Sequence, residues 1–223
     1  MTSNETRSLP SWRLYVIVDP AAMRGRGLAA VAAAAIRGGA DVLQLRDKTV
    51  SVGAVVEAAR VLLPLTRQAG IPLIINDWVE AAAAVGADGV HLGQDDDSIE
   101  EARKRLGPGR LIGLSTHSLA QALAAEQAGA DYIGFGPIFP TPTKPDYGSI
   151  GLDALRKAAS QIRIPMVCVG GIEAGNLDQV LEAGATCVAV VRAVCGAEDP
   201  EAATRELKNR LVQSVRIHDP LSL

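Results

Sequence analysis

A short turn that recurs along the chain constrains its fold more than any other feature. Gly-Ala-Asp occurs at 39–41, 86–88 and 129–131, and Gly-Ala-Thr at 184–186, each time between an Ala-rich segment and a short apolar run. Glycine can adopt the left-handed conformation that ends a helix, so each copy indicates a helix stop before a strand. Four copies of a unit that contains two strands predict eight strands, the number in a closed (β/α)₈ barrel.

The predicted strands are short and almost continuously apolar, as is typical of parallel strands covered on both faces. They are 14–18, 41–45, 73–76, 89–92, 111–115, 132–136, 166–169 and 187–191. The predicted helices are 27–38, 51–69, 78–85, 97–106, 118–128, 151–160, 175–183 and 199–215. An open doubly wound sheet is the alternative, but nothing after Val18 matches its usual G-x-G-x-x-G turn. We expect one α/β domain over residues 1–223, a TIM barrel with an ordered core at about 12–215 and polar tails at both ends.

The composition argues against several classes of protein. The net charge is −3 and no stripe of Lys and Arg is interleaved with aromatic residues, so nucleic acid is not an expected partner. The longest apolar run, Leu28 to Ile36, is too short to cross a bilayer, and the N-terminus lacks the apolar core of a signal peptide. Cys168, Cys187 and Cys195 have no CxxC spacing and are predicted to be buried free thiols. We expect a cytoplasmic protein without a membrane partner, and self-association into a homo-oligomer stays open.

Polar side chains collect at the carboxyl ends of the predicted strands, where a barrel of this kind places its active site. They lie at 44–48, 76–77, 94–97, 115–117, 139–144, 170–171 and 192. The opposite ends of the strands carry only the Gly-Ala-Asp and Ile-Pro turns. We therefore expect a functional site at the first of these two faces.

Two acids at this face are candidate metal ligands. Asp77 and Asp96 follow neighbouring strands, and Mg²⁺ is commonly held by one or two carboxylates together with phosphate oxygens and water. Helix capping is the competing interpretation, which we apply to Asp97 but not to Asp77, because Asp77 follows a buried Asn. Position alone leaves Asp95 and Asp96 as equal candidates for the second ligand.

Cations and a long loop share the same rim. Three cations, Arg46, Lys48 and Lys144, provide more positive charge than a neutral ligand would need. Their charge suits a diphosphate. Salt bridges to nearby acids are the alternative, but exposed pairs contribute only about 0–1 kcal/mol each. The segment 137–150 is long for a barrel loop, which favours a functional lid, and Gly170-Gly171 would let backbone N–H groups approach a phosphate.

The remaining polar residues predict no further catalytic set. His91 lies within a strand and is expected to pack, while His117 is expected to cap a helix or to stack. Without a third imidazole or paired thiolates, a zinc site is not expected. Ser115 has no evident acid–His relay, so a nucleophilic triad is not expected either.

Six of these segments, in this order, resemble the thiamine-phosphate synthase family. They are Gln44-Leu-Arg-Asp-Lys48, Ile75-Asn-Asp77, His91-Leu-Gly-Gln-Asp-Asp96, Gly113-Leu-Ser-Thr-His117, Gly134-Phe-Gly-Pro-Ile-Phe-Pro-Thr-Pro-Thr-Lys144 and Val169-Gly-Gly-Ile172. The resemblance covers about residues 14–195, and the Phe-Pro-Thr-x-Thr-Lys loop combined with both Asp sites makes it specific. The family joins 4-amino-2-methyl-5-hydroxymethylpyrimidine diphosphate to 4-methyl-5-(2-hydroxyethyl)thiazole phosphate and releases diphosphate.

The resemblance implies roles for residues along most of the rim. Asp77 and Asp96 would hold Mg²⁺, and Lys144, Ser115 and Arg46 would be catalytic. The pyrimidine diphosphate would contact Gln44, Leu45, Arg46, Asp47, Lys48, Asn76, Ser115 and Lys144. The thiazole phosphate would contact Thr141, Pro142, Thr143, Gly171, Val191 and Arg192. The family often has Ser at the last of these positions, so Arg192 is a departure from its pattern.

The implied reaction is a dissociative substitution. Diphosphate leaves first, with its charge neutralised by Mg²⁺ and the cations, and the thiazole nitrogen then attacks the pyrimidine cation without a strong base. A thiazole tautomerase on the same barrel is the alternative, but it would not need the acids and cations of the rim. A ligand sensor without catalysis is a third hypothesis, because a fold alone does not fix a function.

Overall fold

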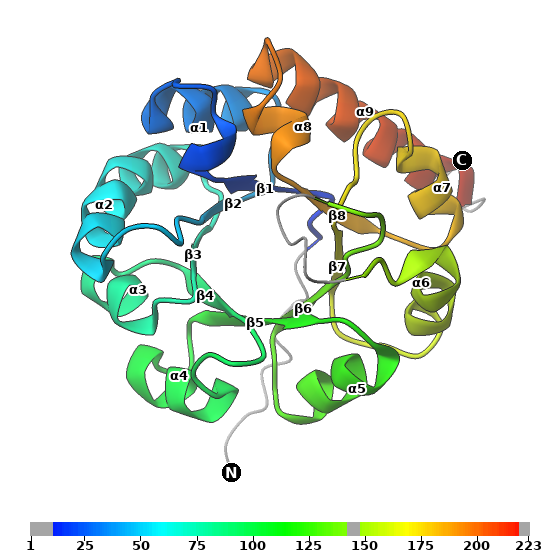
Figure 1. Ribbon diagram of the computed structural model, residues 1–223, viewed down its shortest axis with the longest axis horizontal. Helices are drawn as coiled ribbons and strands as arrows, with labels where there is room; N and C mark the ends of the chain where they lie inside the picture. Colours follow the sequence, from blue (N-terminus) through cyan, green and yellow to red (C-terminus); the bar gives the residue numbers. More distant parts are fainter. Residues whose placement is uncertain (1–10, 142–147, 219–223) are drawn as a thin grey trace.

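The computed structural model of the protein describes residues 11–141 and 148–218 and contains a closed barrel of eight parallel strands (Figure 1). The strands are β1 (Leu14–Val18), β2 (Val42–Leu45), β3 (Leu73–Asn76), β4 (Gly89–Leu92), β5 (Leu111–Thr116), β6 (Tyr132–Phe135), β7 (Met166–Val169) and β8 (Cys187–Val190). They pair in chain order, and β8 closes the barrel on β1. The predicted fold class is therefore confirmed, with every strand within one residue of its predicted bounds.

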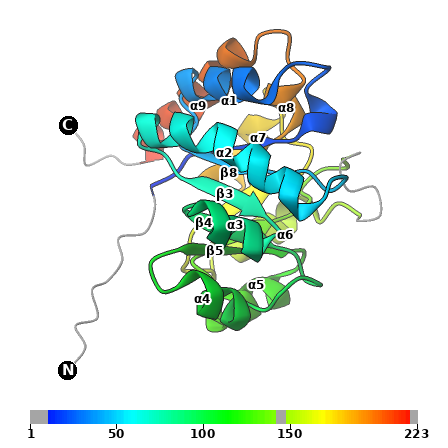
Figure 2. The same ribbon diagram turned by 90° about the vertical axis from the view of Figure 1, so that its left-hand side faces the viewer.

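Helices surround the barrel, as the view from its side also shows (Figure 2). They are η1 (Pro20–Ala22), α1 (Leu28–Arg37), α2 (Val52–Ala69), α3 (Val79–Val85), α4 (Ile99–Leu106), α5 (Leu119–Gln127), α6 (Gly151–Ala159), α7 (Leu177–Glu182), α8 (Arg192–Cys195) and α9 (Pro200–His218). The two shortest, η1 and α8, were not predicted, because single turns are too short to show a helical repeat of apolar residues. None of the helices described is long and apolar enough to cross a membrane.

The core has an outer and an inner layer. Along β1, Leu14, Val16 and Val18 pack outward against the helices, whereas Tyr15 and Ile17 pack inside the barrel. This alternation follows from the two-residue period of a strand. The three cysteines are free and buried, as predicted.

The repeated Gly-Ala-Asp turns fasten the amino-terminal ends of the strands. In each copy the Asp backbone N–H donates to the carbonyl of the first or second residue of the preceding strand, and the Asp carboxylate accepts the N–H of that same residue. The pairs are Asp41 with Leu14, Asp88 with Leu73 and Asp131 with Ile112, with carboxylate distances of 2.9, 2.9 and 2.7 Å. We call this two-bond contact the Asp clasp. The turns are therefore structural, and they lie at the end of the barrel opposite to the polar rim.

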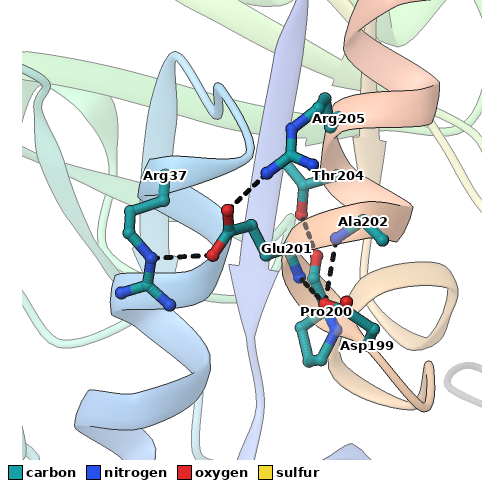
Figure 3. A network of polar contacts seen from close by, with 7 residues as sticks. All are labelled: Arg37, Asp199, Pro200, Glu201, Ala202, Thr204 and Arg205. Carbon is teal, nitrogen blue, oxygen red and sulfur yellow. Dashed lines mark hydrogen bonds and ion pairs between the residues drawn. The ribbon is translucent and has the colours of Figure 1, made fainter.

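The helix α9 lies beside the helix α1 (Figure 3). Asp199 caps α9, because its Oδ1 accepts the N–H groups of Glu201 and Ala202, both at 3.0 Å. Glu201 forms ion pairs with Arg37 of α1, at 2.7 Å, and with Arg205 one turn further along α9. These contacts hold α9 beside α1, so that helices cover the closing pair of strands.

One predicted cap is wrong. Ser98, not Asp97, caps α4, and its hydroxyl and the Glu101 side chain form a reciprocal capping box. Asp97 instead pairs with Arg105 at 2.9 Å. The physical reason is that Ser98 precedes Glu101 by three residues, the spacing at which each side chain reaches the other's backbone N–H.

We predict that Asp88→Ala lowers the free energy of unfolding by about 1–2 kcal/mol, because the N–H of fully buried Leu73 loses its acceptor. Urea unfolding measures the change. Glu57→Ala is the matched control: Glu57 is an exposed carboxylate whose ion pair lies on the surface of α2, so we expect a change below about 0.5 kcal/mol. Equal effects in the two variants would contradict a structural role for the Asp clasp.

Candidate active site

A pocket lies at the carboxyl ends of the strands and brings together side chains from distant parts of the sequence. Of the residues predicted to contact the two substrates, it is lined by Gln44, Arg46, Ser115, Thr141, Gly171, Val191 and Arg192. Leu45 packs in the outer core layer, so its side chain does not face this pocket. Pro142, Thr143 and Lys144 lie outside the described residues.

Two acids and a lysine meet beside this pocket. Lys48 Nζ lies 3.0 Å from the carboxylate of Asp77. Burial raises the pKa of Asp77, Lys48 lowers it, and the neighbouring carboxylate of Asp96 raises it again, so the two acids lie close enough to interact. Asp96 also accepts the N–H of Gly93 at 2.6 Å, which fixes its position. The acid that acts on Asp77 is therefore Asp96, which favours it over Asp95 as the second candidate ligand.

The local backbone explains why Asp77 is available to a ligand. Asp77 follows Asn76, which is 9% exposed, and adopts a left-handed conformation with φ of 64°. The helix α3 begins two residues later at Val79, and the residue at its N-cap is Trp78, which makes no side-chain cap. The competing interpretation of Asp77 as a helix cap is therefore not supported.

The composition of this cluster suits a hard cation. Carboxylate oxygens are ligands that Mg²⁺ prefers, and Mg²⁺ usually keeps water and substrate phosphate as its other ligands. In the part of the chain that the structure describes, no third Asp, Glu, His or Cys completes a metal cage. Asp77 and Asp96 therefore fit a metal whose remaining ligands come from a phosphorylated substrate and water.

Arg46 is held in place by an acid that the sequence analysis missed. Asp19 follows β1, is 6% exposed, and forms an ion pair with the Arg46 guanidinium. The other oxygen of Asp19 accepts the N–H of Ala21 at 3.0 Å. The signal that could have identified Asp19 is its place as the first polar residue after the first strand, at the same face as the other candidates. Asp47, by contrast, is half-buried and shapes its own turn by accepting hydrogen bonds from the hydroxyl and the N–H of Thr49, at 2.7 and 3.0 Å.

His91 makes polar contacts that its predicted packing role did not include. His91 does not merely pack, because its Nε2 lies 2.9 Å from Ser115 Oγ and its Nδ1 lies 3.2 Å from the Tyr132 hydroxyl. A Ser–His contact therefore exists, although its third member is a phenol and not the acid of a nucleophilic triad. The sequence could not reveal this contact, since the three residues come from three separate strands.

His117, which was expected to cap a helix or to stack, does not cap α5. Ser118 caps α5, with its hydroxyl 3.2 Å from the Gln121 N–H, and the Nδ1 of His117 contacts the carbonyl of Gly136 instead. Its side chain thereby joins the fifth strand to the start of the long loop after β6.

The loop after β6 and the Gly-Gly pair after β7 form one structure. The N–H groups of Ile138 and Phe139 donate to the carbonyls of Val169 and Gly170, at 2.9 and 3.0 Å. A Cβ added to Gly171 would lie 2.7 Å from Phe139 Cβ, and Gly171 has a φ of 65°, so only glycine fits this close approach. The two loops therefore form one continuous wall of the pocket.

A residue missed in the sequence fastens this wall from behind. Asn176 Nδ2 donates to the Gly171 carbonyl at 2.8 Å, and its Oδ1 accepts the N–H of Glu173 at 2.9 Å. Arg192 begins the short helix α8 after the neighbouring strand β8 and lines the same pocket. The site thus has two regions that suit anions: the Arg46–Lys48 side and the Gly171–Arg192 side.

The chain is similar to known proteins over most of its length. The model of a family described as thiamine monophosphate synthase matches residues 14–194. A thiamine-phosphate synthase of Chloroflexus aurantiacus is 51% identical over 198 residues, which cover 88% of this chain and 91% of the relative. One of Roseiflexus is 50% identical over 195 residues, with coverages of 87% and 83%. The solved thiamine phosphate pyrophosphorylase from Pyrococcus furiosus matches with a TM-score of 0.85 and 40% identity, over 92% of this chain and 98% of that one.

The raised pKa of Asp77 predicts that its ionised carboxylate destabilises the folded protein. A carboxyl whose pKa is raised by folding destabilises the folded state above that pKa, and the cost disappears as the pH falls towards the ordinary value, 3.8. In EDTA at pH 7.5 we therefore expect Asp77→Asn to melt at least as high as the parent, with a difference that shrinks towards acidic pH. Asn also tolerates the left-handed backbone. Asp153→Asn, at a side chain that is 91% exposed, is the control and should leave the Tm unchanged. A clearly lower Tm for Asp77→Asn at pH 7.5 would contradict this account.

Proposed function

The chain belongs to the thiamine-phosphate synthase family of transferases, and on this premise we propose that its pocket joins the pyrimidine diphosphate to the thiazole phosphate with Mg²⁺ held by Asp77 and Asp96. The observation that carries the proposal is the meeting of these two carboxylates with Lys48 at the rim. Like charges side by side are costly unless a cation lies between them. A metal-bound diphosphate supplies that cation and accepts hydrogen bonds from the nearby bases.

The diphosphate of the first substrate would lie on the Arg46–Lys48 side. Arg46 offers a guanidinium already oriented by Asp19, and Lys48 offers an ammonium that would move from Asp77 to a phosphate oxygen. Lys144, which lies outside the described residues, and Asn76 would complete this side. Bound Mg²⁺ would supply neutralisation of the charge that grows on the departing diphosphate.

The two organic rings would lie deeper in the pocket. Gln44 and Ser115 are the polar side chains proposed to bind the pyrimidine. The phosphate of the thiazole would lie against Gly171, Val191 and Arg192, with Thr141 beside them. Arg192 would give this anion a bidentate contact that a shorter Ser could not.

The chain's own residues would act mainly by position and charge. Arg46 and Lys48 stabilise negative charge on the leaving group, and the anchored thiazole phosphate holds the ring nitrogen near the cation that remains. That nitrogen has no proton to lose, so no general base is required. A tautomerase would make no use of the acid pair, and the relatives at about 50% identity are synthases. We place this reaction in the cytoplasm, where the three buried thiols would stay reduced.

Incubation with both substrates and MgCl₂ tests the function directly. We expect a product with the mass of thiamine phosphate and one equivalent of diphosphate, and neither product after EDTA is added. Isomerisation of a thiazole without diphosphate release would favour the tautomerase. Binding of both substrates without product would favour the sensor.

Two neighbouring aspartates allow a matched test of the metal assignment. We predict that Asp96→Asn lowers kcat/KM by about 100-fold, the scale of losing one key electrostatic contact in the transition state. Asp97→Asn should stay within about twofold of the parent, because Asp97 pairs with Arg105 on α4. Equal losses in both variants, or near-normal turnover of Asp96→Asn at saturating Mg²⁺, would contradict the assignment.

A further inference from the structure

A chain of hydrogen bonds crosses the inside of the barrel between the two residues proposed to bind the pyrimidine. Gln44 Nε2 donates to the Tyr15 hydroxyl at 2.9 Å, and the hydroxyls of Tyr15 and Tyr132 lie 3.0 Å apart. From Tyr132 the chain continues through both nitrogens of His91 to Ser115, as described above. We call these five residues the polar chain. They come from five different strands, and all of them line the pocket.

The direction of one bond in the polar chain fixes the direction of the next. An amide nitrogen can only donate, so Tyr15 accepts from Gln44 and has its single O–H left for Tyr132. Tyr132 in turn donates to Nδ1 of His91. A neutral imidazole that accepts at Nδ1 carries its proton on Nε2, so His91 donates to Ser115 Oγ. The Ser115 hydroxyl then has its own proton left for a ligand.

The two ends of the polar chain are therefore coupled. If the Gln44 amide were rotated by 180°, its oxygen would face Tyr15 and accept from it, and every later hydrogen bond in the polar chain would run in the opposite direction. Ser115 would then donate to His91 and could only accept from a ligand. A mixture of the two directions would leave a buried donor without an acceptor, at a cost of about 1–3 kcal/mol. Water has little access to a mismatch at the two phenols, because Tyr15 and Tyr132 are 2% and 1% exposed. Burial also raises the pKa of both phenols, so each remains a protonated donor.

We propose that the polar chain sets the hydrogen-bond polarity of the pyrimidine pocket and thereby selects a 4-aminopyrimidine over its 4-oxo analogue. This inference rests on the proposed function, which brings a pyrimidine to Gln44 and Ser115. An aminopyrimidine presents an N–H donor beside a ring nitrogen that accepts, and it has a second acceptor across the ring. Gln44 Oε1, the second N–H of Gln44 and the Ser115 O–H match this pattern.

The 4-oxo analogue presents the opposite pattern, a carbonyl beside a ring N–H. Binding it in the same place would require the whole polar chain to reverse. Tyr15, Tyr132 and His91 act here by orienting Gln44 and Ser115, so they are positioning residues. They affect which ring is accepted, and they take no part in breaking the bond to diphosphate.

The direction of the polar chain can be measured without substrate. The protein has three histidines, so selective ¹⁵N labelling gives few imidazole signals, and His91→Gln identifies those of His91. At pH 7.5 we expect a neutral His91 with its proton on Nε2, and in Tyr132→Phe, which lacks the donor to Nδ1, both tautomers. A parent ring protonated on Nδ1, or on both nitrogens, would overturn the inference. Because this measurement needs no reaction, it separates failure of the inference from failure of the proposed function.

Substrate selectivity provides the second readout. We expect Tyr132→Phe to lower the ratio of kcat/KM for the aminopyrimidine diphosphate to that for its 4-oxo analogue by about tenfold, the effect of one hydrogen bond. Thr66→Val is the control, since it removes another buried hydroxyl, bonded to the Leu63 carbonyl at 3.1 Å within α2. The control should keep both the ratio and the His91 tautomer. An unchanged ratio in folded Tyr132→Phe, or an equal fall in Thr66→Val, would overturn the inference, and the parent tautomer decides if Tyr132→Phe does not fold.

Discussion

Closure of a sheet of parallel strands is the constraint on which the rest of the molecule depends. Because all eight strands run in the same direction, every carboxyl end arrives at one rim. Asp19, Arg46, Asp77 and Arg192 lie far apart in the sequence, yet they reach the same mouth of the barrel through four different strands. Charged residues are therefore brought together at this rim simply because they lie at the ends of the strands or in the loops that follow. The paired acids are the clearest result, since burial and the charge of Asp96 both raise the pKa of Asp77.

The two ends of the barrel divide stability from function. At the amino-terminal ends, the Asp clasp satisfies each carboxylate with backbone N–H groups of a neighbouring strand. At the other end, Asp77 forms an ion pair with Lys48 and lies close enough to Asp96 for the two carboxylates to interact, an arrangement that suits a cation. The interior of the barrel joins the rim to the core, because the polar chain replaces apolar packing with hydrogen bonds at the depth where a pyrimidine ring would lie. The same residue type thus fastens the fold at one end and would hold the substrate at the other.

Much of the fold could be predicted because its signals are local. Gly39, Gly86, Gly129 and Gly184 all have the positive φ that the repeated turns require, and the apolar runs coincide with the strands. The rim was predictable because strand ends can be located from the same pattern. The contacts of Asp19, His91 and Tyr132 could not be predicted. Hydrogen bonds across the barrel depend on which of the alternating residues of each strand point inward, and sequence spacing does not tell which set this is. The cap of α4 was missed for another reason, because both Asp97 and Ser98 are good caps and only the partner Glu101 decides between them.

The central claim is that Asp77 and Asp96 together hold the metal of a departing diphosphate. The most direct measurement is anomalous diffraction from crystals of the protein soaked with Mn²⁺ and diphosphate, in which the metal can be located without ambiguity. The account predicts one strong peak between these two carboxylates, with the diphosphate contacting both the metal and Lys48. A peak bound elsewhere, or diphosphate bound at the rim with no metal between Asp77 and Asp96, would contradict it.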